Sequence, residues 1–447
     1  MRSTIVKSMI LGICFISLTA CSIFDFGRER RAAEEAEDKA GRIALAIGDQ
    51  PIEADPEMVD VSVILPLPTT RLDWPQAGAR PNKVVGHVAA AENFEVEWRV
   101  RAADGSDRQR ALASPPVATR DTIFLIDGEQ TVKAFDLETG NRKWSIRLKS
   151  GSRRDRTGFG GGIAVAGDQL VVSSGFGFVA LLDGDTGEEV WRRDLGGPVS
   201  GAPTISGENV LVVTQNNEVF ALSLETGDVE WSDQAIAESA RVLGAPSVAA
   251  IEDLVVAPFS SGEVIAYLST NGRRLWTDAL TRSGRFTPIS ALNDIASRPV
   301  LSAGVVYAAS QSGVFAAIDG RSGQRIWSQP IGSVQAPALV GPYLFLSGVE
   351  GQVICVASNT GAVIWATQLP RFKNEGRRRG RISYAGPIVA SGRVIVASSE
   401  GDLIALSPQT GEEEARIDLK DPVFIEPIAV GDRLIILTDE GRLISVR

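Results

Sequence analysis

The hydrophobic and polar positions of this chain repeat in units that each end in an apolar pair, a polar turn with a glycine, and a tryptophan four residues after that glycine. The complete copies are Gly140–Trp144, Gly187–Trp191, Gly227–Trp231, Gly272–Trp276, Gly323–Trp327 and Gly361–Trp365, and a seventh copy has Ala415 four residues after Gly411. The glycines lie 38 to 51 residues apart. A period of this length, with strand-like runs between the turns, predicts a β-propeller.

Each unit also contains a strongly apolar run rich in β-branched residues, which is typical of a strand buried between stacked blades. These runs are Thr122–Ile126, Leu170–Ser173, Val210–Thr214, Leu254–Pro258, Val305–Ala309, Tyr343–Leu346, Val394–Ala397 and Leu434–Leu437. They predict an all-β fold, an eight-bladed propeller of four-stranded antiparallel blades.

The two ends of the repeat region complement each other. The last unit stops at Arg447 without a fourth strand, whereas Phe94–Val100 is a tryptophan-bearing strand with no unit before it. We therefore expect this N-terminal strand to pair with the C-terminal blade, so that the ring closes without an unpaired edge.

The N-terminus reads as a secretory signal over residues 1–20. Arg2 and Lys7 precede a short apolar run that is too short for a good transmembrane helix. The sequence from Leu18 to Cys21 resembles the bacterial lipobox, which implies cleavage before Cys21 and its modification by diacylglyceryl and acyl chains such as palmitate. The alternative is an ordinary signal peptide that happens to end at a cysteine.

Residues 21–72 are expected to form a flexible tether from the lipidated cysteine. A dense mixed-charge run is followed there by several prolines, a composition that buries little apolar surface. Residues 73–447 are assigned to the propeller and a segment that docks on it, with Trp74 as its first anchored residue.

The formal net charge of −10 argues against nucleic acid as the main partner. If Cys14 leaves with the signal and Cys21 carries lipid, Cys355 is the remaining thiol, and its apolar neighbours predict a core position. With one histidine, His87, and no cysteine pair, we expect no metal site.

The repeat resembles the tryptophan-docking motif of the pyrroloquinoline-quinone dehydrogenase propellers. Those enzymes also carry an adjacent cysteine pair, a calcium site and a catalytic aspartate, and no matching stretch is found in this sequence. No nucleophile elbow is present either. We therefore expect no cofactor, no catalytic residues and no enzymatic activity, with a dehydrogenase kept as an alternative.

The connections from each tryptophan strand to the next inner strand lie on one face of a propeller, and a rigid scaffold often carries function on such loops. Three are long: Trp144–Gly162, Trp276–Pro299 and Trp365–Pro387. The basic stretches Arg147–Arg156 and Arg371–Arg381 suit an acidic partner or lipid headgroups, and the simpler alternative is a solvated mobile loop.

Together, the lipobox, the tether and the eight repeats resemble the BamB family of lipoproteins over essentially the whole chain. The resemblance implies a non-enzymatic scaffold of the outer-membrane β-barrel assembly machinery, lipid-anchored at the periplasmic face of the outer membrane. It would bind the periplasmic POTRA domains of the insertase BamA, and other subunits, and assist insertion of outer-membrane proteins. Another class of function is a ligand or peptide binder that uses the central channel or an outer blade edge.

The family's insertase contact lies on two neighbouring loops, which correspond here to 238–246 and 292–299. Arg241 and Asp294 match the family pattern, and Leu243 and Leu292 are expected to supply apolar contact. The chain departs from the pattern at Glu238, Ala240 and Ala296. With both charged residues on the surface, alanine substitution should change stability little. The alternative is that Arg241 and Asp294 pair with each other and only order the loops.

Overall fold

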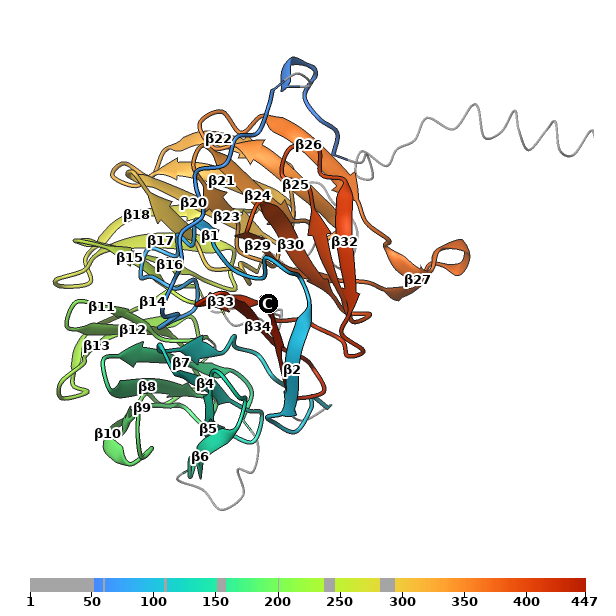
Figure 1. The fold of residues 1–447 in the computed structure, drawn as a ribbon. Helices are drawn as coiled ribbons and strands as arrows, with labels where there is room; N and C mark the ends of the chain where they lie inside the picture. The colour runs from blue at the N-terminus through green and yellow to red at the C-terminus, as the bar shows by residue number, and fades with distance from the viewer. Residues whose placement is uncertain are drawn as a thin grey trace, which may run out of the picture. The chain divides into compact units, whose positions relative to one another are not determined.

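Eight antiparallel sheets follow one another along the chain and are arranged around a common centre, as the colour sequence in Figure 1 shows. This is a computed structural model, and it describes residues 52–447 except 59–60, 108–110, 151–157, 200, 237–245 and 282–293. The prediction of an all-β propeller with eight four-stranded blades is confirmed. No helix among the described residues is long and apolar enough to cross a membrane.

The first seven blades each take four consecutive strands from the innermost to the outermost. Blade 1 is β3–β6 (Val117–Ala118, Thr122–Ile126, Thr131–Asp136, Arg142–Arg147), blade 2 is β7–β10 (Gly161–Ala166, Gln169–Ser174, Phe178–Asp183, Glu189–Asp194), and blade 3 is β11–β14 (Thr204–Ser206, Asn209–Val213, Glu218–Ser223, Val229–Gln234). Blade 4 is β15–β18 (Ala249–Ile251, Leu254–Pro258, Glu263–Leu268, Arg274–Ala279) and blade 5 is β19–β22 (Val300–Ser302, Val305–Ser310, Val314–Asp319, Arg325–Gln329). Blade 6 is β23–β26 (Ala338–Val340, Tyr343–Ser347, Gln352–Ala357, Val363–Gln368) and blade 7 is β29–β32 (Tyr384–Ala390, Arg393–Ser398, Asp402–Leu406, Glu413–Asp418).

Blade 8 combines the two ends of the propeller sequence. Its strands are β33–β35 (Ile428–Val430, Arg433–Leu437, Arg442–Val446), and β2 (Val96–Arg101) pairs antiparallel with β35. Blade 7 also has a fifth strand, because β1 (His87–Val88) pairs parallel with β29. The remaining elements are η1 (Pro56–Met58) and a hairpin made of β27 (Phe372–Asn374), η2 (Glu375–Arg377) and β28 (Arg379–Arg381).

Burial along a blade follows the hydrophobic pattern of its strands. In blade 1, all five residues of β4 are buried, whereas the residues of β6 alternate between exposed and partly buried. A register shift after Ala134 in β5 places Trp144 directly opposite Ala134. The second strand is therefore enclosed by neighbouring blades, while the outermost strand faces solvent with alternate side chains.

The repeated tryptophan lies over the repeated glycine of the next blade. A Cβ atom added to Gly272 would lie 2.5 Å from an atom of the Trp231 ring, and the same overlap recurs at the turns of neighbouring blades. The glycine is thus required for close approach of an aromatic ring as well as for its positive φ, which is 68° at Gly272. The tryptophans fill the spaces between neighbouring blades.

Each of the six repeat tryptophans also makes a polar contact across the same junction. The indole Nε1 donates to a backbone carbonyl of the following blade's turn, as Trp231 does to Ser269 at 2.8 Å. The other pairs are Trp144 with Gly184, Trp191 with Leu224, Trp276 with Gly320, Trp327 with Ser358 and Trp365 with Pro408. Each junction therefore combines an apolar ring contact with a hydrogen bond that satisfies a buried donor.

The junctions next to blade 8 differ from the others. Trp98 of β2 lies over Gly140 of blade 1, but its Nε1 has no acceptor among the described residues. Blade 7 has Ala415 in the tryptophan position, and Ala415 packs against a large apolar cluster that contains Phe94. Elsewhere in the core, Cys355 is fully buried as expected, and burial raises the pKa of its thiol.

A strap formed by residues 69–91 crosses the inner ends of the blades. Its first half forms hydrogen bonds with four blades. Arg71 pairs with Gly431 of blade 8, and Trp74 pairs with Ala118 of blade 1. The Val165 amide of blade 2 donates to the Pro75 carbonyl, and the Ile205 amide of blade 3 donates to the Gln76 side chain. In its second half, the carbonyl of Pro81 accepts from the Ala250 amide of blade 4, and the carbonyl of Asn82 accepts from the Leu301 amide of blade 5. Val84 packs on the apolar cluster of blades 5 and 6, and His87 pairs with Val389 of blade 7.

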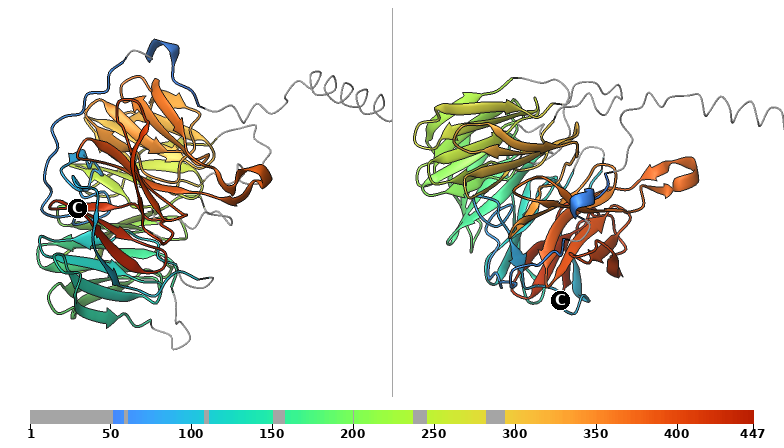
Figure 2. Two further views of the ribbon diagram at one scale, coloured as in Figure 1. Left: turned by 45° about the vertical axis from the view of Figure 1, so that its right-hand side comes forward. Right: turned by 90° about the horizontal axis from the view of Figure 1, so that it is seen from above.

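The strap is an integral part of the fold, as the blue segment alongside the inner strands in Figures 1 and 2 illustrates. Trp74 is 1% exposed, which agrees with its prediction as a docking residue. The carbonyl and amide groups of the strap complete the inner edges of the blades, so this end of the central channel is covered by protein.

The prediction of a flexible tether over residues 21–72 is wrong for its C-terminal part. Val63 is 1% exposed within the apolar cluster of blades 6 and 7. Asp55 exchanges two hydrogen bonds with Val363, at 2.8 and 2.6 Å. Prolines exclude regular structure here, but an extended chain still docks through isolated side chains and backbone groups on the outside of the propeller.

A matched pair of glycine substitutions tests the contact between blades. Gly304 has a φ of 79° and no neighbour within 4 Å of an added Cβ, so Gly304→Ala should cost only the backbone strain of about 1–2 kcal/mol. Gly272→Ala should add about 1–3 kcal/mol for displacing Trp231. Urea denaturation measures the loss of unfolding free energy in both variants. Equal losses would mean that the contact with the tryptophan ring contributes nothing.

Candidate functional site

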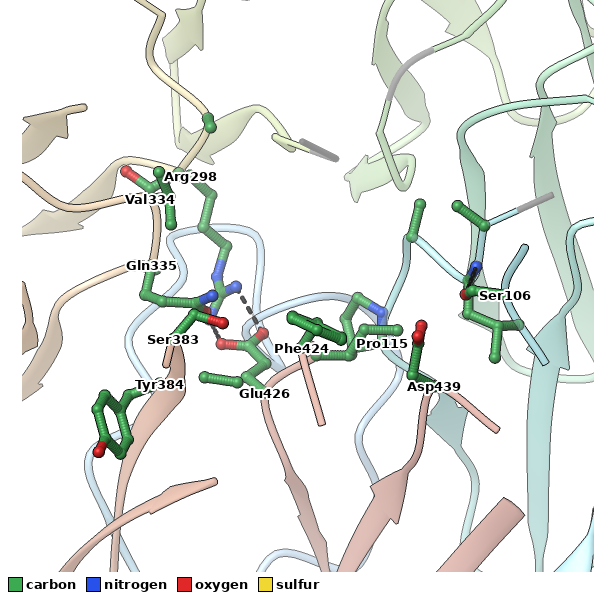
Figure 3. A pocket seen from close by; sticks show the side chains of 18 of the residues that line it. Ser106, Pro115, Arg298, Val334, Gln335, Ser383, Tyr384, Phe424, Glu426 and Asp439 are labelled. Atoms are coloured by element: carbon green, nitrogen blue, oxygen red, sulfur yellow. Dashed lines mark hydrogen bonds and ion pairs between the residues drawn. The ribbon is translucent and has the colours of Figure 1, made fainter. Parts of the chain in front are cut away.

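The face that carries the connections between blades surrounds a cavity of about 400 Å³ at the mouth of the central channel. Residues from several connections line it, and they include Arg298, Gln335, Tyr384, Phe424 and Glu426 (Figure 3). Phe424 is 48% exposed. The strap lies at the other ends of the inner strands, so the channel is a cup that opens on this face.

An ion pair spans the cup. Arg298 precedes the first strand of blade 5 and Glu426 precedes the first strand of blade 8, and the two side chains meet at 2.5 Å between Nη1 and Oε1. The Arg298 side chain is 13% exposed and the Glu426 side chain 10% exposed. Figure 3 shows the two side chains directed toward each other, linking blades that are not neighbours. Losing one partner of such a buried pair leaves an uncompensated charge.

Lys83 of the strap is electrostatically linked to this pair. It is 1% exposed and its Nζ donates to Thr204 Oγ1 at 2.8 Å. Burial, followed by the nearby positive charge of Arg298, lowers the pKa of Lys83 well below its ordinary value, with a smaller opposing effect from Glu426. The charged form of Lys83 is therefore disfavoured in the folded protein.

The strongly basic connection between blades 6 and 7 is a hairpin rather than the loop expected from the sequence. β27 and β28 pair through Phe372 with Arg381 and Asn374 with Arg379. Asn374 caps η2 by accepting from the Arg377 amide at 3.0 Å. The hairpin extends away from the blades in all views of Figures 1 and 2.

Of the predicted partner-binding residues, the structure describes only Asp294; Arg241, Leu243 and Leu292 lie outside the described residues. Cys21, the predicted lipidation site, also lies outside them. Asp294 is 4% exposed and is followed by the fully buried Ile295. The premise that Asp294 is a surface residue is therefore wrong, because its loop turns into the core where blades 4 and 5 meet.

In the described part of the chain, no three His, Cys, Asp or Glu side chains lie close enough together to hold a metal ion. The polar side chains that line the cup are the Arg298–Glu426 ion pair, the carboxylate of Asp439, and amide and hydroxyl groups such as those of Gln335 and Ser383. This arrangement suits recognition of another molecule's polar groups.

Comparison with known proteins identifies the family to which this chain belongs. The model of the family described as outer membrane protein assembly factor BamB matches residues 128–367 and 371–447. The chain belongs to the BamB family. Among its relatives, BamB of Yersinia pestis is 26% identical over 72% of this chain and 80% of its own length. BamB of Escherichia coli K12 is 26% identical, over 74% of this chain and 83% of its own length.

Solved structures agree on the fold. BamB from Moraxella catarrhalis superposes with a TM-score of 0.61 at 18% identity, covering 78% of this chain and 96% of its own. A quinohemoprotein alcohol dehydrogenase from Pseudomonas putida superposes with a TM-score of 0.63 at 12% identity, covering 84% of this chain and 80% of its own. BamB proteins and quinoprotein dehydrogenases thus share the propeller, and the fold by itself does not separate them.

Sequence reasoning missed the ion pair, although the repeats contain a signal for it. One position near the start of each inner strand is equivalent in the eight blades; it lies four residues before the last residue of that strand, or three in blade 1. In blade order these residues are Pro115, Gly162, Ala202, Ser247, Arg298, Ala336, Gly386 and Glu426. The other six are small or proline, so two opposite charges at equivalent places in a ring predict a contact across its centre.

The buried lysine gives a pH-dependent prediction. Since folding lowers the pKa of Lys83, the unfolded chain binds more protons between the two pKa values, and stability rises with pH in that window. Lys83→Met removes the free-energy cost of burying a charged amine, so the variant should be more stable than wild type at pH 7. This advantage should shrink by pH 9. Urea denaturation at both pH values measures it.

Lys149→Met, at an exposed position, is the control and should show no such pH dependence. An advantage of Lys83→Met that stays constant or grows with pH would contradict the assignment of a charge penalty to Lys83.

Proposed function

We propose that this protein is a non-enzymatic scaffold lipoprotein of the outer-membrane β-barrel assembly machinery. It binds the periplasmic POTRA domains of a BamA-like insertase together with other machinery subunits, and it assists the insertion of outer-membrane proteins. The observation that carries the proposal is the match to the family of assembly factors, which extends over most of the propeller.

The proposed partner surface is formed by the two loops 238–246 and 292–299. In the sequence these loops precede the first strands of blades 4 and 5. Arg241, Leu243 and Leu292 are the proposed contact residues, because an arginine beside aliphatic side chains is a frequent composition of binding hot spots. Asp294 is proposed to support this surface from below, since its side chain is buried.

We also propose that the mature protein begins at a lipidated Cys21 and is held at the periplasmic face of the outer membrane. Thirty residues, 22–51, separate Cys21 from Ile52, the first residue that the structure describes. Several acyl chains on one residue anchor a protein firmly.

Closure of the ring by the N-terminal strand belongs to the same proposal. Its support is the pairing of β2 with β35 and the position of Trp98 over Gly140 of blade 1. A closed ring would give the partner a face of fixed geometry, with blade 1 held against blade 8.

Binding of the purified POTRA domains tests the function. Arg241→Ala should weaken this binding by about 1–3 kcal/mol, roughly fivefold to 150-fold in Kd, with an unchanged melting temperature. Titration calorimetry measures the binding. Arg273→Ala, an exposed position in the turn before β18 at the opposite ends of the blades, is the control and should bind normally.

If wild-type protein does not bind the POTRA domains, the proposed function is wrong. If Arg241→Ala loses binding and stability together, the alternative of an internal ion pair with Asp294 is correct. A quinone-dependent oxidation of alcohols by the purified protein would instead favour the dehydrogenase alternative.

Lipidation is tested separately. Mass spectrometry of the protein isolated from membranes should find Cys21 as a modified N-terminal residue. Cys21→Ala should leave the protein uncleaved or released from the membrane, while the propeller keeps its melting temperature. An unmodified Cys21, or a mature N-terminus elsewhere, would refute the anchor.

A further inference from the structure

The hairpin β27–η2–β28 concentrates positive charge on an acidic protein. The whole chain has 55 acidic and 45 basic residues. Between 371 and 381 the balance is reversed, with six basic residues and one acid, Glu375. Residues 373–381 are all exposed.

Ion pairs hold the base of the hairpin in place. Glu350, in the turn between β24 and β25 of blade 6, pairs with both Arg371 and Arg381, the latter at 3.1 Å. Glu400, in the corresponding turn of blade 7, pairs with Lys373 at 2.7 Å. Two neighbouring blades therefore fix both strands of the hairpin.

Backbone contacts and a buried ring add to this support. The Tyr384 hydroxyl donates to the Pro370 carbonyl at 2.8 Å, and Tyr384 is 6% exposed. Ile382, also buried, donates its amide to the Arg371 carbonyl at 2.9 Å. The hairpin is thus a supported projection, which contrasts with the solvated mobile loop considered from the sequence.

The arginines at the tip are left available. Glu375 accepts from the amides of Arg371 and Phe372, at 2.7 and 3.0 Å, so its carboxylate is used within the hairpin. Arg377, Arg378 and Arg379 form no ion pair with any residue that the structure describes. Three consecutive guanidinium groups are therefore presented to solvent on a fixed support.

We infer that this hairpin is a docking element for an acidic polypeptide segment, separate from the proposed insertase contact. Guanidinium groups match carboxylates in charge and in bidentate geometry. A segment with several Asp or Glu residues would meet the three tip arginines without disturbing the base, whose charges are already paired.

A protein partner fits the hairpin better than a membrane surface. Residues 373–381 have no apolar side chain that would enter a bilayer interface. Electrostatic interactions extend only about 8 Å at physiological ionic strength. A local acidic segment can face the hairpin alone, whereas a flat anionic membrane would also approach the rest of a chain whose formal net charge is −10.

The test uses the full chain and two defined peptides, one of twelve residues alternating Glu and Ser and one with Gln in place of Glu. Fluorescence anisotropy should detect salt-sensitive binding of the Glu peptide and none of the Gln peptide. The triple variant Arg377→Gln, Arg378→Gln, Arg379→Gln should weaken binding at least tenfold with an unchanged melting temperature, because the three side chains are exposed.

The matched control removes the same charge at the opposite ends of the blades, through Arg142→Gln, Arg273→Gln and Arg321→Gln, which are all exposed. It should change the Kd less than twofold. Equal affinities of wild type and the tip variant, or no binding of the Glu peptide by wild type, would overturn the inference.

A third arm uses vesicles of phosphatidylglycerol and phosphatidylcholine. Wild-type protein that sediments with these vesicles through the tip arginines, while ignoring the Glu peptide, would replace the polypeptide by a membrane surface. The insertase binding described above is measured independently of these arms, so a failure of the hairpin inference leaves the proposed function intact, and the reverse also holds.

Discussion

The contact of a tryptophan ring with the backbone of a glycine in the next blade sets the geometry of this propeller. The contact runs in one direction around the propeller, since each of blades 1 to 6 supplies the tryptophan for one junction and the glycine for the other. A side chain of any size at the glycine would separate two blades, and a small residue at the tryptophan would leave a gap. Where the chain has Ala415, a segment from the other end of the propeller, including Phe94, contributes to the apolar cluster at that position.

The sequence predicts the blades well because each of the first seven blades is a local structure. Its strands follow one another within about fifty residues, and its turns are marked by glycine, so counting apolar runs was enough to obtain eight blades. The strap and the outer segment around Val63 have no such signature. They dock an extended chain through backbone groups and isolated side chains, and those contacts join residues that are hundreds of positions apart, such as Asp55 and Val363.

Prediction of the candidate site was also limited because its contacts join residues that are far apart in the sequence. Family resemblance pointed to two loops, but the burial of Asp294 depends on packing between blades 4 and 5, which the loop sequence does not reveal. Arg298 and Glu426 are 128 residues apart and become partners only because the ring brings blades 5 and 8 to opposite sides of one cup. The available clue was that two charged residues occupy a repeat position that otherwise carries small residues or proline. It becomes visible only when the repeats are compared with one another.

The strap has a consequence for the order in which the molecule acquires its structure. Its residues are synthesised before any blade, yet their bonding partners extend as far as Gly431 near the C-terminus. Contacts of such high sequence separation cannot form until nearly the whole chain has emerged, and they slow folding because a long loop must be closed first. The strap is therefore not fixed along its whole length until the last blade has formed, and until then the inner edges of the later blades remain open to pairing with other chains.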